Sequence, residues 1–363
     1  MGERLPRTLA VRLDSDGDVL LMGPALRALR AGSSQLDLLV APTGAHAARL
    51  LPGVDEVLVL DPPWTGLDPA PVDPAGLSAL VERLRSRAHD VAVIFTSFHQ
   101  SPLPMALLAR WAGIPRVAAT CDDHPGSLLD VRHRRLPEGD DDGGPTGGHE
   151  VTAALRLAEA AGFPAAVGDD QRLRLGPLPD RRPGALPRGS YVVVHPGASV
   201  PSRQLGFGLA HAFATSLLTD GWDVVVTGGP GEEELCAEAT PAGATSLAGL
   251  TSLAELARVL DDAAAVVVGN TGPAHLAAAV GTPVVSVFSP VVPVERWGPW
   301  GVPHVVLGDQ QAPCRATRAR ECPVLGHPCL STVAPLQVSD AVEDLAGIPP
   351  VRALRVTSTG GAP

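Results

Sequence analysis

Two glycine-bearing loops in the second half of the chain combine residue types that bind anions. The first follows the apolar run "YVVV" and carries Gly197, Ser199 and Arg203 just after His195. Glycine lets a backbone approach a ligand closely, a hydroxyl donates a hydrogen bond, and a guanidinium offers a fork of donors. This spacing therefore suits a phosphate oxygen, although an ordinary turn with a surface arginine has the same pattern.

The second loop, "GNTGPAH", joins a buried run to a helix of small residues. Gly272 and Pro273 predict a sharp helix start, where free backbone N–H groups attract a pyrophosphate. Asn270 and Thr271 can bond to phosphate or sugar, and His275 lies one turn after Thr271 on the same side. A lone histidine on such a helix is usually structural, but the combination favours an anion site.

A third loop, "TGGPGEEEL", lacks the spacing of a dinucleotide fingerprint, and a proline interrupts it. Its acidic run begins a helix, where negative side chains complement the helix dipole. One of these carboxylates can instead accept hydrogen bonds from ribose hydroxyls, and we assign Glu233 to the donor site. Thr251, further along the chain, completes the predicted donor-binding set.

In the first half, "VRLDSDGDVLL" places Asp14, Asp16 and Asp18 within five residues. A calcium loop is excluded because Gly17 is its fourth residue, not its sixth. A two-aspartate metal site stays open on this weak signal. Asp18, at a predicted helix start, is best placed as a general base, and the alternative role for it is an N-cap. Gly17, Ser97 and His99 are assigned to the acceptor side.

The segment "CRATRARECPVLGHPCL" holds Cys314, Cys322, Cys329 and His327. Three thiols and a histidine can bind zinc, but the spacing is irregular and no C-x-x-C pair is present. We favour a loop held by packing or by a disulfide, and expect no metal in the functional site.

Apolar runs alternate with helical stretches throughout, which predicts parallel sheets covered on both faces. The runs form two series, separated by the Pro- and Gly-rich stretch 176–190, so we predict domains at 1–178 and 187–348 with a cleft between them. The predicted strands are 8–14, 36–41, 54–61, 90–97, 116–121, 191–197, 223–229, 263–270, 283–288 and 304–309. Ligands bind at the carboxyl ends of such strands, where all the loops above lie.

Composition and charge bear on the partners and the location of the protein. The 363 residues include 28 basic ones, none of them lysine, and 39 acidic ones, for a net charge of -11. This balance argues against nucleic acid as the main partner. No signal peptide and no uninterrupted apolar run of about 20 residues is visible, which favours a cytoplasmic protein. Local arginine clusters leave contact with the inner membrane surface open.

The chain resembles the heptosyltransferase family, glycosyltransferase family 9, over nearly its whole length. "VRLDSDGDVLLMGPALRALR", "VVVHPGAS" with Arg203, and "GNTGPAHLAAAVGTPVVSVFSP" followed by "RWGPWG" carry the resemblance in the family's order. It implies a GT-B fold, with two Rossmann-like domains, the first for the acceptor and the second for the donor. Asn270 stands where these enzymes often carry Asp, and Asp16 replaces an apolar residue.

The resemblance also implies inverting, metal-independent transfer of a heptose or related sugar from a nucleotide-diphosphate donor such as ADP-heptose. Asp18 would be the base, Arg203 a phosphate ligand, and Thr271, Gly272 and His275 the diphosphate and sugar loop. The acceptor would be a glycan, a glycolipid or a small molecule, and no cofactor is expected. Two alternatives remain: a nucleotide-sugar-binding protein without transferase activity, and a sugar-nucleotide epimerase of the same fold.

Overall fold

The computed structural model describes residues 4–66, 69–97, 100–135, 148–180, 183 and 186–349. The chain forms two compact units, Met1–Gly176 and Pro177–Pro363, each with its own sheet. The boundary lies at the start of the Pro- and Gly-rich stretch predicted as a linker. The predicted acceptor-side residue His99 and most of the acidic, glycine-rich stretch 137–149 lie outside the described residues.

Unit 1 is built on a six-stranded parallel sheet in the order β3-β2-β1-β4-β5-β6. The apolar runs are nearly fully buried, because helices cover both faces of the sheet. The strand order changes direction between β1 and β4, which is the place where doubly wound sheets bind ligands. The strands are β1 Arg7–Arg12, β2 Gln35–Val40, β3 Glu56–Val59, β4 Val91–Phe95, β5 Arg116–Thr120 and β6 Val131–His133.

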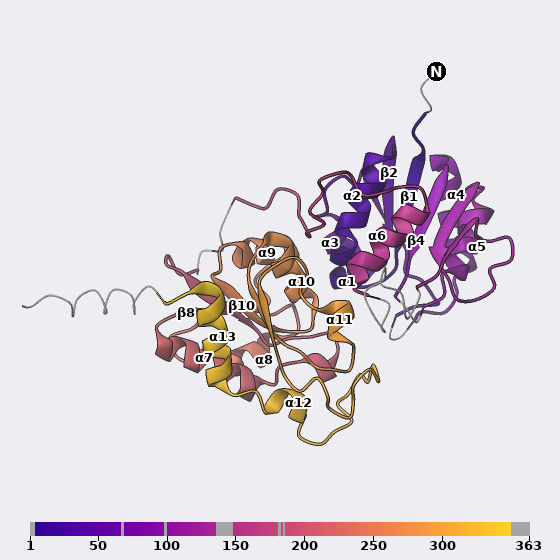
Figure 1. The fold of residues 1–363 in the computed structure, drawn as a ribbon. Coiled ribbons are helices and arrows are strands. Elements are labelled where there is room, and N and C mark those ends of the chain that lie inside the picture. The colour runs from indigo at the N-terminus through magenta and orange to yellow at the C-terminus, as the bar shows by residue number, and fades with distance from the viewer. Residues whose placement is uncertain are drawn as a thin grey trace, which may run out of the picture. The chain divides into compact units, whose positions relative to one another are not determined.

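Helices α2, α3 and α6 lie on one side of this sheet, and α4 and α5 lie on the other (Figure 1). The short helix α1 follows β1 and packs against α3. Because β1 borders the switch point, the β1–α1 loop lies there. The helices are α1 Asp16–Leu21, α2 Gly23–Ala31, the 3-10 turn η1 Pro42–Gly44, α3 Ala45–Ala48, α4 Pro74–Arg87, α5 Leu103–Trp111 and α6 Glu150–Ala160.

Unit 2 repeats this topology, with a parallel sheet in the order β12-β11-β10-β7-β8-β9. Its switch point lies between β7 and β10, so the loops after these two strands are neighbours. The strands are β7 Tyr191–His195, β8 Asp223–Val226, β9 Thr245–Ser246, β10 Ala265–Gly269, β11 Val284–Val287 and β12 His304–Leu307.

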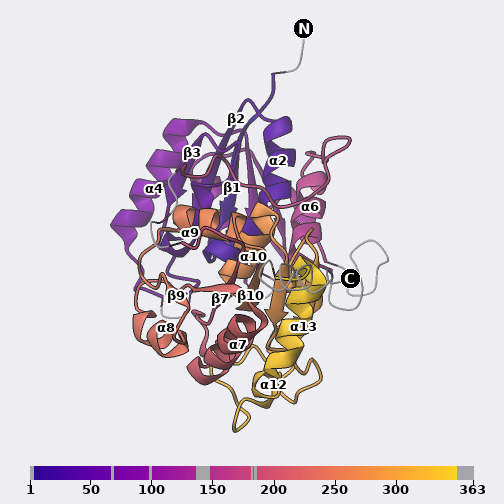
Figure 2. The ribbon, with the colours of Figure 1, turned by 90° about the vertical axis from the view of Figure 1, so that its left-hand side faces the viewer.

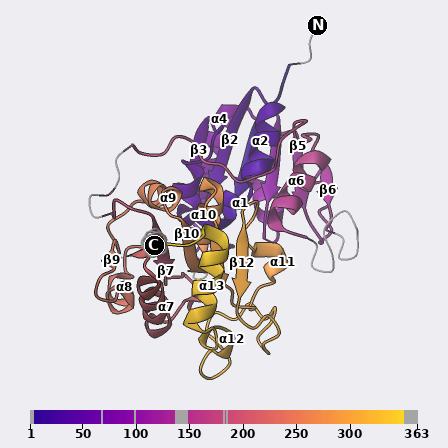
Figure 3. The same cartoon turned by 60° about the vertical axis from the view of Figure 1, so that its left-hand side comes forward.

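The core of unit 2 lies between the sheet and helices α7, α8 and α13. Figures 2 and 3 show α13 in yellow beside α7, while α9 and α10 pack together elsewhere on the unit. The helices are η2 Pro201–Arg203, α7 Phe207–Asp220, α8 Glu233–Ala239, α9 Leu253–Asp261, α10 Gly272–Val280, α11 Val294–Trp297, α12 Pro328–Ser331 and α13 Pro335–Ala346.

All ten predicted strands are present. Nine are shorter than predicted by one to four residues, and β2 has the predicted length but begins one residue earlier. The ends differ because the polar residues that follow each apolar run belong to loops. The last helix, which lies within the predicted second domain, belongs to unit 2, where Val338 and Val342 join the core. Two short strands, β6 and β9, were not predicted.

Candidate active site

The switch point of unit 1 is organised around a buried arginine. Arg12, the last residue of β1, has a side chain only 4% exposed. Its Nε lies 2.7 Å from Asp14 Oδ2, and its Nη2 donates to Asp18 Oδ1 at 3.2 Å. Nη2 also donates to Ser97 Oγ at 3.1 Å and lies 3.7 Å from Glu150 Oε2. Burial alone would lower the pKa of Arg12, but the three carboxylates raise it overall.

Asp18, the predicted base, occupies the third position of α1. The N-cap residue is Ser15, and no side chain makes the cap hydrogen bond. The Asp18 carboxylate instead accepts from Arg12 through Oδ1 and from the Ser15 hydroxyl through Oδ2, at 3.0 Å. The N-cap alternative for Asp18 is therefore wrong. Its side chain is 21% exposed, so part of the carboxylate stays open to solvent.

Asp16 faces away from Asp18. Its Oδ1 accepts the backbone N–H of Ala47 at 2.7 Å, and its Oδ2 lies 3.7 Å from His46 Nδ1. Burial raises the pKa of Asp16, and the Ala47 hydrogen bond opposes that shift. Asp16 thus anchors α3, and its like charge is directed away from the predicted base.

Asp14 is held on the opposite side of Arg12. Gln100 Nε2 donates to Asp14 Oδ1 at 2.6 Å, and Ser97 Oγ donates to Oδ2 at 3.3 Å. Burial raises the pKa of Asp14, while Arg12 lowers it. The structure therefore gives Asp14 and Asp16 different partners, and the literal Asp-Ser-Asp motif does not form one site. Of the predicted acceptor-side residues, Ser97 is buried in this cluster and Gly17 is buried in α1.

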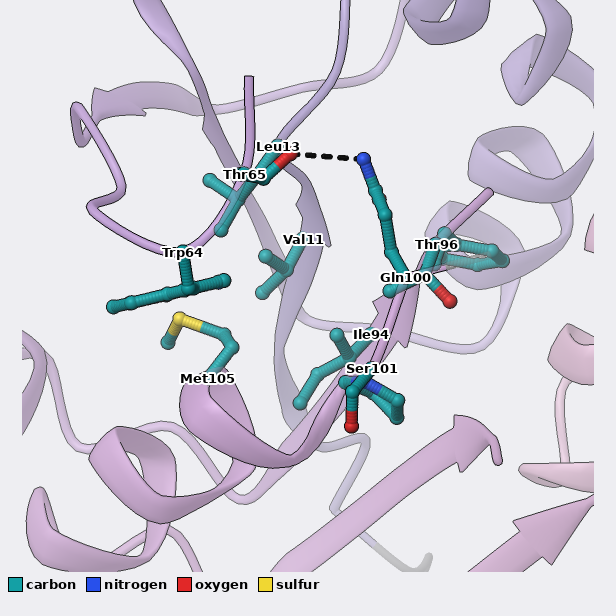
Figure 4. Close-up of a pocket in the computed structure, with 11 residues that line it drawn as sticks. Val11, Leu13, Trp64, Thr65, Ile94, Thr96, Gln100, Ser101 and Met105 are labelled. Carbon is teal, nitrogen blue, oxygen red and sulfur yellow. Dashed lines mark hydrogen bonds between the residues drawn. The ribbon is translucent and has the colours of Figure 1, made fainter. Parts of the chain in front are cut away.

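A small pocket adjoins the cluster at the ends of β1 and β4 (Figure 4). Gln100 crosses it and also donates to Thr65 Oγ1 at 2.8 Å. Trp64, Leu13 and Met105 supply apolar walls. The enclosed space is about that of one water molecule, so it is too small for a sugar ring.

In unit 2, the loops after β7 and β10 touch at the switch point. A Cβ added to Gly269 would come within 2.5 Å of the carbonyl oxygen of Arg203. Glycine at the end of β10 thus lets the η2 turn lie directly against the "GNTGPAH" loop. The structure brings the backbone of Arg203 next to that loop, and a role of its side chain in phosphate binding stays a prediction.

The start of α10 is as predicted. Thr271 is the N-cap residue, and its side chain makes no cap hydrogen bond. Gly272 and Pro273 form the first turn, and His275 is buried within it. Gly272 does not adopt a positive φ, so its backbone conformation does not itself require glycine. Thr271, Gly272 and Pro273 are each half-buried, so the helix N-terminus is partly accessible to an anion.

Asn270 has a structural role that the sequence did not reveal. Its Oδ1 accepts the backbone N–H of Ser289 at 3.0 Å, and its Nδ2 donates to the Ser289 carbonyl at 3.1 Å. The amide therefore ties the loop after β10 to the loop after β11. A direct contact between Asn270 and a sugar stays a prediction, with only one amide hydrogen left for it.

Glu232, rather than Glu233, faces the loop after β7. A Cβ on Gly197 would lie 2.2 Å from either Glu232 carboxylate oxygen, so glycine makes room for this side chain. Glu232 Oε2 accepts the Gly229 N–H at 2.8 Å. Glu233 is exposed and folds back onto the Gly231 N–H at 2.9 Å. Glu232 is the N-cap residue of α8 and Glu233 its first helical residue, so their side chains point in different directions and the sequence could not choose between them.

His195 lies beside this carboxylate. Its Nδ1 contacts Thr227 Oγ1 at 3.0 Å, and its Nε2 lies 3.9 Å from Glu232 Oε2. Burial lowers the pKa of His195 to about 4. The imidazole is therefore neutral at neutral pH, and its contact with Glu232 is not an ion pair. Of the remaining predicted donor residues, Ser199 is exposed after β7, and Thr251 is half-buried just before the Ser252 cap of α9.

The cysteine segment supports the η2 turn. Ser202 Oγ donates to the Ala319 carbonyl at 2.6 Å, and the Ser202 N–H donates to the Arg320 carbonyl at 2.8 Å. All five cysteines are free thiols, with Cys314 and Cys329 buried and Cys322 half-buried, so a loop held by packing is the interpretation that fits. Within the described ranges, no group of three His, Cys, Asp or Glu is arranged to hold a metal ion.

Comparison with known proteins decides the family. The family model "Glycosyltransferase family 9 (heptosyltransferase)" matches residues 149–327, which include the β7, β8 and β10 loops. The chain belongs to the heptosyltransferase family. Lipopolysaccharide heptosyltransferase 1 of Pseudomonas aeruginosa is 30% identical over 247 residues, 66% of each chain. Lipopolysaccharide heptosyltransferase 3 of Escherichia coli is 32% identical over 117 residues, and the match spans only 34% of that relative.

Solved structures of this family share the fold. A glycosyltransferase family 9 protein from Veillonella parvula superposes with a TM-score of 0.74 at 18% identity, covering 95% of this chain and 98% of the other. The E. coli ADP-heptose heptosyltransferase II gives 0.67 at 19% identity, covering 94% and 98%. These likenesses confirm the predicted GT-B fold class. None of the helices that the structure describes is both long and apolar enough to cross a membrane.

Proposed function

We propose that this family member is a glycosyltransferase that moves a heptose or a related sugar from a nucleotide-diphosphate donor, such as ADP-heptose, to an acceptor hydroxyl. The observation that carries the proposal is the junction of Arg203, Gly269 and the α10 N-terminus at the switch point of unit 2. Family membership supports the same assignment, because it adds a sugar donor to what the loops alone indicate. The acceptor is a glycan, a glycolipid or a small molecule.

The donor diphosphate would bind where the guanidinium of Arg203 and the N-terminus of α10 meet. Arg203 supplies a guanidinium, and the first turn of α10 supplies backbone N–H groups and the positive end of the helix dipole. As the bond to the sugar breaks, the leaving diphosphate gains charge, and these groups stabilise it. Glu232, beside Gly197, would accept hydrogen bonds from the ribose hydroxyls.

Asp18 would take the proton from the acceptor hydroxyl. It is the partly exposed carboxylate of the unit 1 cluster, and its oxygens accept hydrogen bonds from Arg12 and Ser15. Removing the proton raises the nucleophilicity of the oxygen that attacks the sugar. Direct attack on the anomeric carbon inverts its configuration, so we propose an inverting, metal-independent reaction.

The test is release of nucleoside diphosphate from a panel of nucleotide sugars, with and without glycan acceptors. Donors are first ranked by thermal shift, because a bound ligand stabilises the folded state. Acceptor-dependent release supports the proposal, and NMR of the product reports the anomeric configuration. Activity that persists in excess EDTA supports metal independence, whereas activity that EDTA removes and a divalent ion restores refutes it. Binding without release at any acceptor indicates a non-catalytic nucleotide-sugar protein.

A further inference from the structure

The buried position of Arg12 calls for an explanation beyond folding. Taking a guanidinium out of water costs several kcal/mol unless it is paired with good geometry. Arg12 is paired, but its partners come from three places in the chain: Asp14 in the β1–α1 loop, Asp18 on α1, and Glu150 at the start of α6. One cation is therefore shared among three carboxylates, two of which are almost fully buried.

Glu150 has a cation of its own. Arg135 Nη1 donates to Glu150 Oε1 at 2.7 Å, and Arg135 Nη2 donates to the Gly148 carbonyl at 2.9 Å. Arg12 is further from Glu150, at 3.7 Å. Arg135 thus satisfies most of the Glu150 charge, which leaves the Arg12 guanidinium available to Asp14 and Asp18.

The contacts of Arg12 also fix the orientation of Asp18. Arg12 Nη2 donates hydrogen bonds to both Asp18 Oδ1 and the Ser97 hydroxyl oxygen. Asp18 Oδ2 is bonded to the hydroxyl of Ser15, an exposed residue that an incoming acceptor hydroxyl can replace. One oxygen is therefore anchored, and the other is directed toward solvent-accessible space.

We propose that Arg12 is the positioning residue for Asp18, and that Glu150 sets how much of the Arg12 charge Asp18 receives. This inference rests on the proposed function, in which Asp18 is the base. Arg12 does not touch the acceptor: it acts by holding the Asp18 carboxylate ionised and aimed. Removing the cation, Arg12, and removing the competing anion, Glu150, should therefore have opposite effects on the ionisation of Asp18.

The neighbours of Asp18 determine the sign of each effect. Asp16, on the same helix, is turned toward α3 and contributes little. Without Arg12, the negative neighbours would favour a protonated base; without the Glu150 charge, Arg12 would favour an ionised base more strongly. Among the residues that the structure describes, the charged groups of this cluster besides Asp18 are Arg12 from β1, Asp14 from the following loop, and Glu150 with Arg135 from the α6 side.

The experiment measures acceptor-dependent transfer against pH. Arg12→Gln should lower kcat about tenfold or more, leave the donor KM unchanged, and move the acidic limb of the profile up by about one pH unit or more. Glu150→Gln should move that limb to lower pH. Arg12→Lys keeps the positive charge but lacks the planar fork of N–H donors. It should therefore restore the wild-type position of the acidic limb, but not the full kcat.

Arg27→Gln is the matched control. Arg27 forms a two-bond ion pair with Asp169, at 2.8 and 2.7 Å, in the same unit but outside the cluster. This variant should lose stability without moving the acidic limb. A purely structural role for Arg12 would give Arg12→Gln the same behaviour, and that result overturns the inference.

The two hypotheses fail in different ways. If the wild-type protein transfers no sugar, the proposed function is wrong. If the wild type transfers sugar, and both Arg12→Gln and Glu150→Gln keep the acidic limb at the wild-type pH, only the inference is wrong. Should Arg12→Gln not fold, as judged by its melting curve, Glu150→Gln decides alone: a shift to lower pH supports the inference, and no shift overturns it.

Discussion

The carbonyl oxygen of Arg203 lies so close to Gly269 that a Cβ there would come within 2.5 Å of it. This contact joins the loops after β7 and β10 and sets the η2 turn against the start of α10. Backbone atoms cannot move aside as a flexible side chain can, so the contact needs glycine at this position. The junction is the structural basis of the proposed diphosphate site.

Gly269→Ala should therefore push the two loops apart and weaken binding of the donor nucleotide by about 1–3 kcal/mol, the usual cost of overpacking. Calorimetric titration with the nucleoside diphosphate measures the change. Gly208→Ala is the control, because nothing lies within 4 Å of an added Cβ at that helical position. Equal affinities in both variants would show that the loop junction does not shape the binding site.

Arg203→Ala should weaken nucleoside diphosphate binding by about 1.5–3 kcal/mol, the typical contribution of a hydrogen bond to a charged group. Arg188→Ala removes an exposed arginine that precedes β7, at the opposite end of that strand, and should change little. Calorimetry on both variants makes the comparison. Unchanged affinity in Arg203→Ala would place this residue outside the donor site.

The two neighbouring glutamates should behave differently. Glu232→Gln should lower nucleotide affinity by about 1.5–3 kcal/mol, because a charged acceptor over Gly197 is lost. Glu233→Gln should change it by less than about 0.5 kcal/mol, since this side chain is exposed and folded onto its own loop. A larger loss for Glu233→Gln would restore the assignment made from the sequence.

The buried His195 should make the free energy of unfolding of the protein depend on pH. Its pKa is lowered to about 4 in the folded protein, from 6.5, because the ring is buried. The unfolded chain therefore binds the proton more tightly, and stability falls as pH drops below about 6.5, by up to about 3 kcal/mol at pH 4. His195→Asn, which can keep the Thr227 contact, should lose this component. Urea midpoints of both proteins between pH 7 and 5 measure it, and parallel curves would contradict the prediction.

The strands could be predicted because each is a continuous apolar run bounded by polar or glycine residues. The two that were missed, β6 and β9, are edge strands of three and two residues with incomplete burial. So short a segment has no periodicity to detect. Their absence from the prediction did not disturb the site, because the switch points involve β1, β4, β7 and β10.

The site could be predicted only as far as local sequence determines it. The start of α10 follows from Gly272 and Pro273, and the sequence placed it correctly. The contact of Arg12 with Glu150 joins residues 138 positions apart, and no local pattern indicates it. Asn270 was interpreted as a ligand for phosphate or sugar because it is polar at a strand end, and no local pattern indicated that its amide also bonds to the Ser289 backbone.

The most direct test of the account is a comparison of wild-type protein with Asp18→Asn in acceptor-dependent release of nucleoside diphosphate, with donor binding measured by calorimetry on the same samples. The account predicts that the wild type releases nucleoside diphosphate and that Asp18→Asn is slower by about 10²–10⁴-fold, the range for a lost general base. Donor affinity should be the same in both, because the donor loops lie in unit 2 and Asp18 lies in unit 1. Equal release rates would contradict the account.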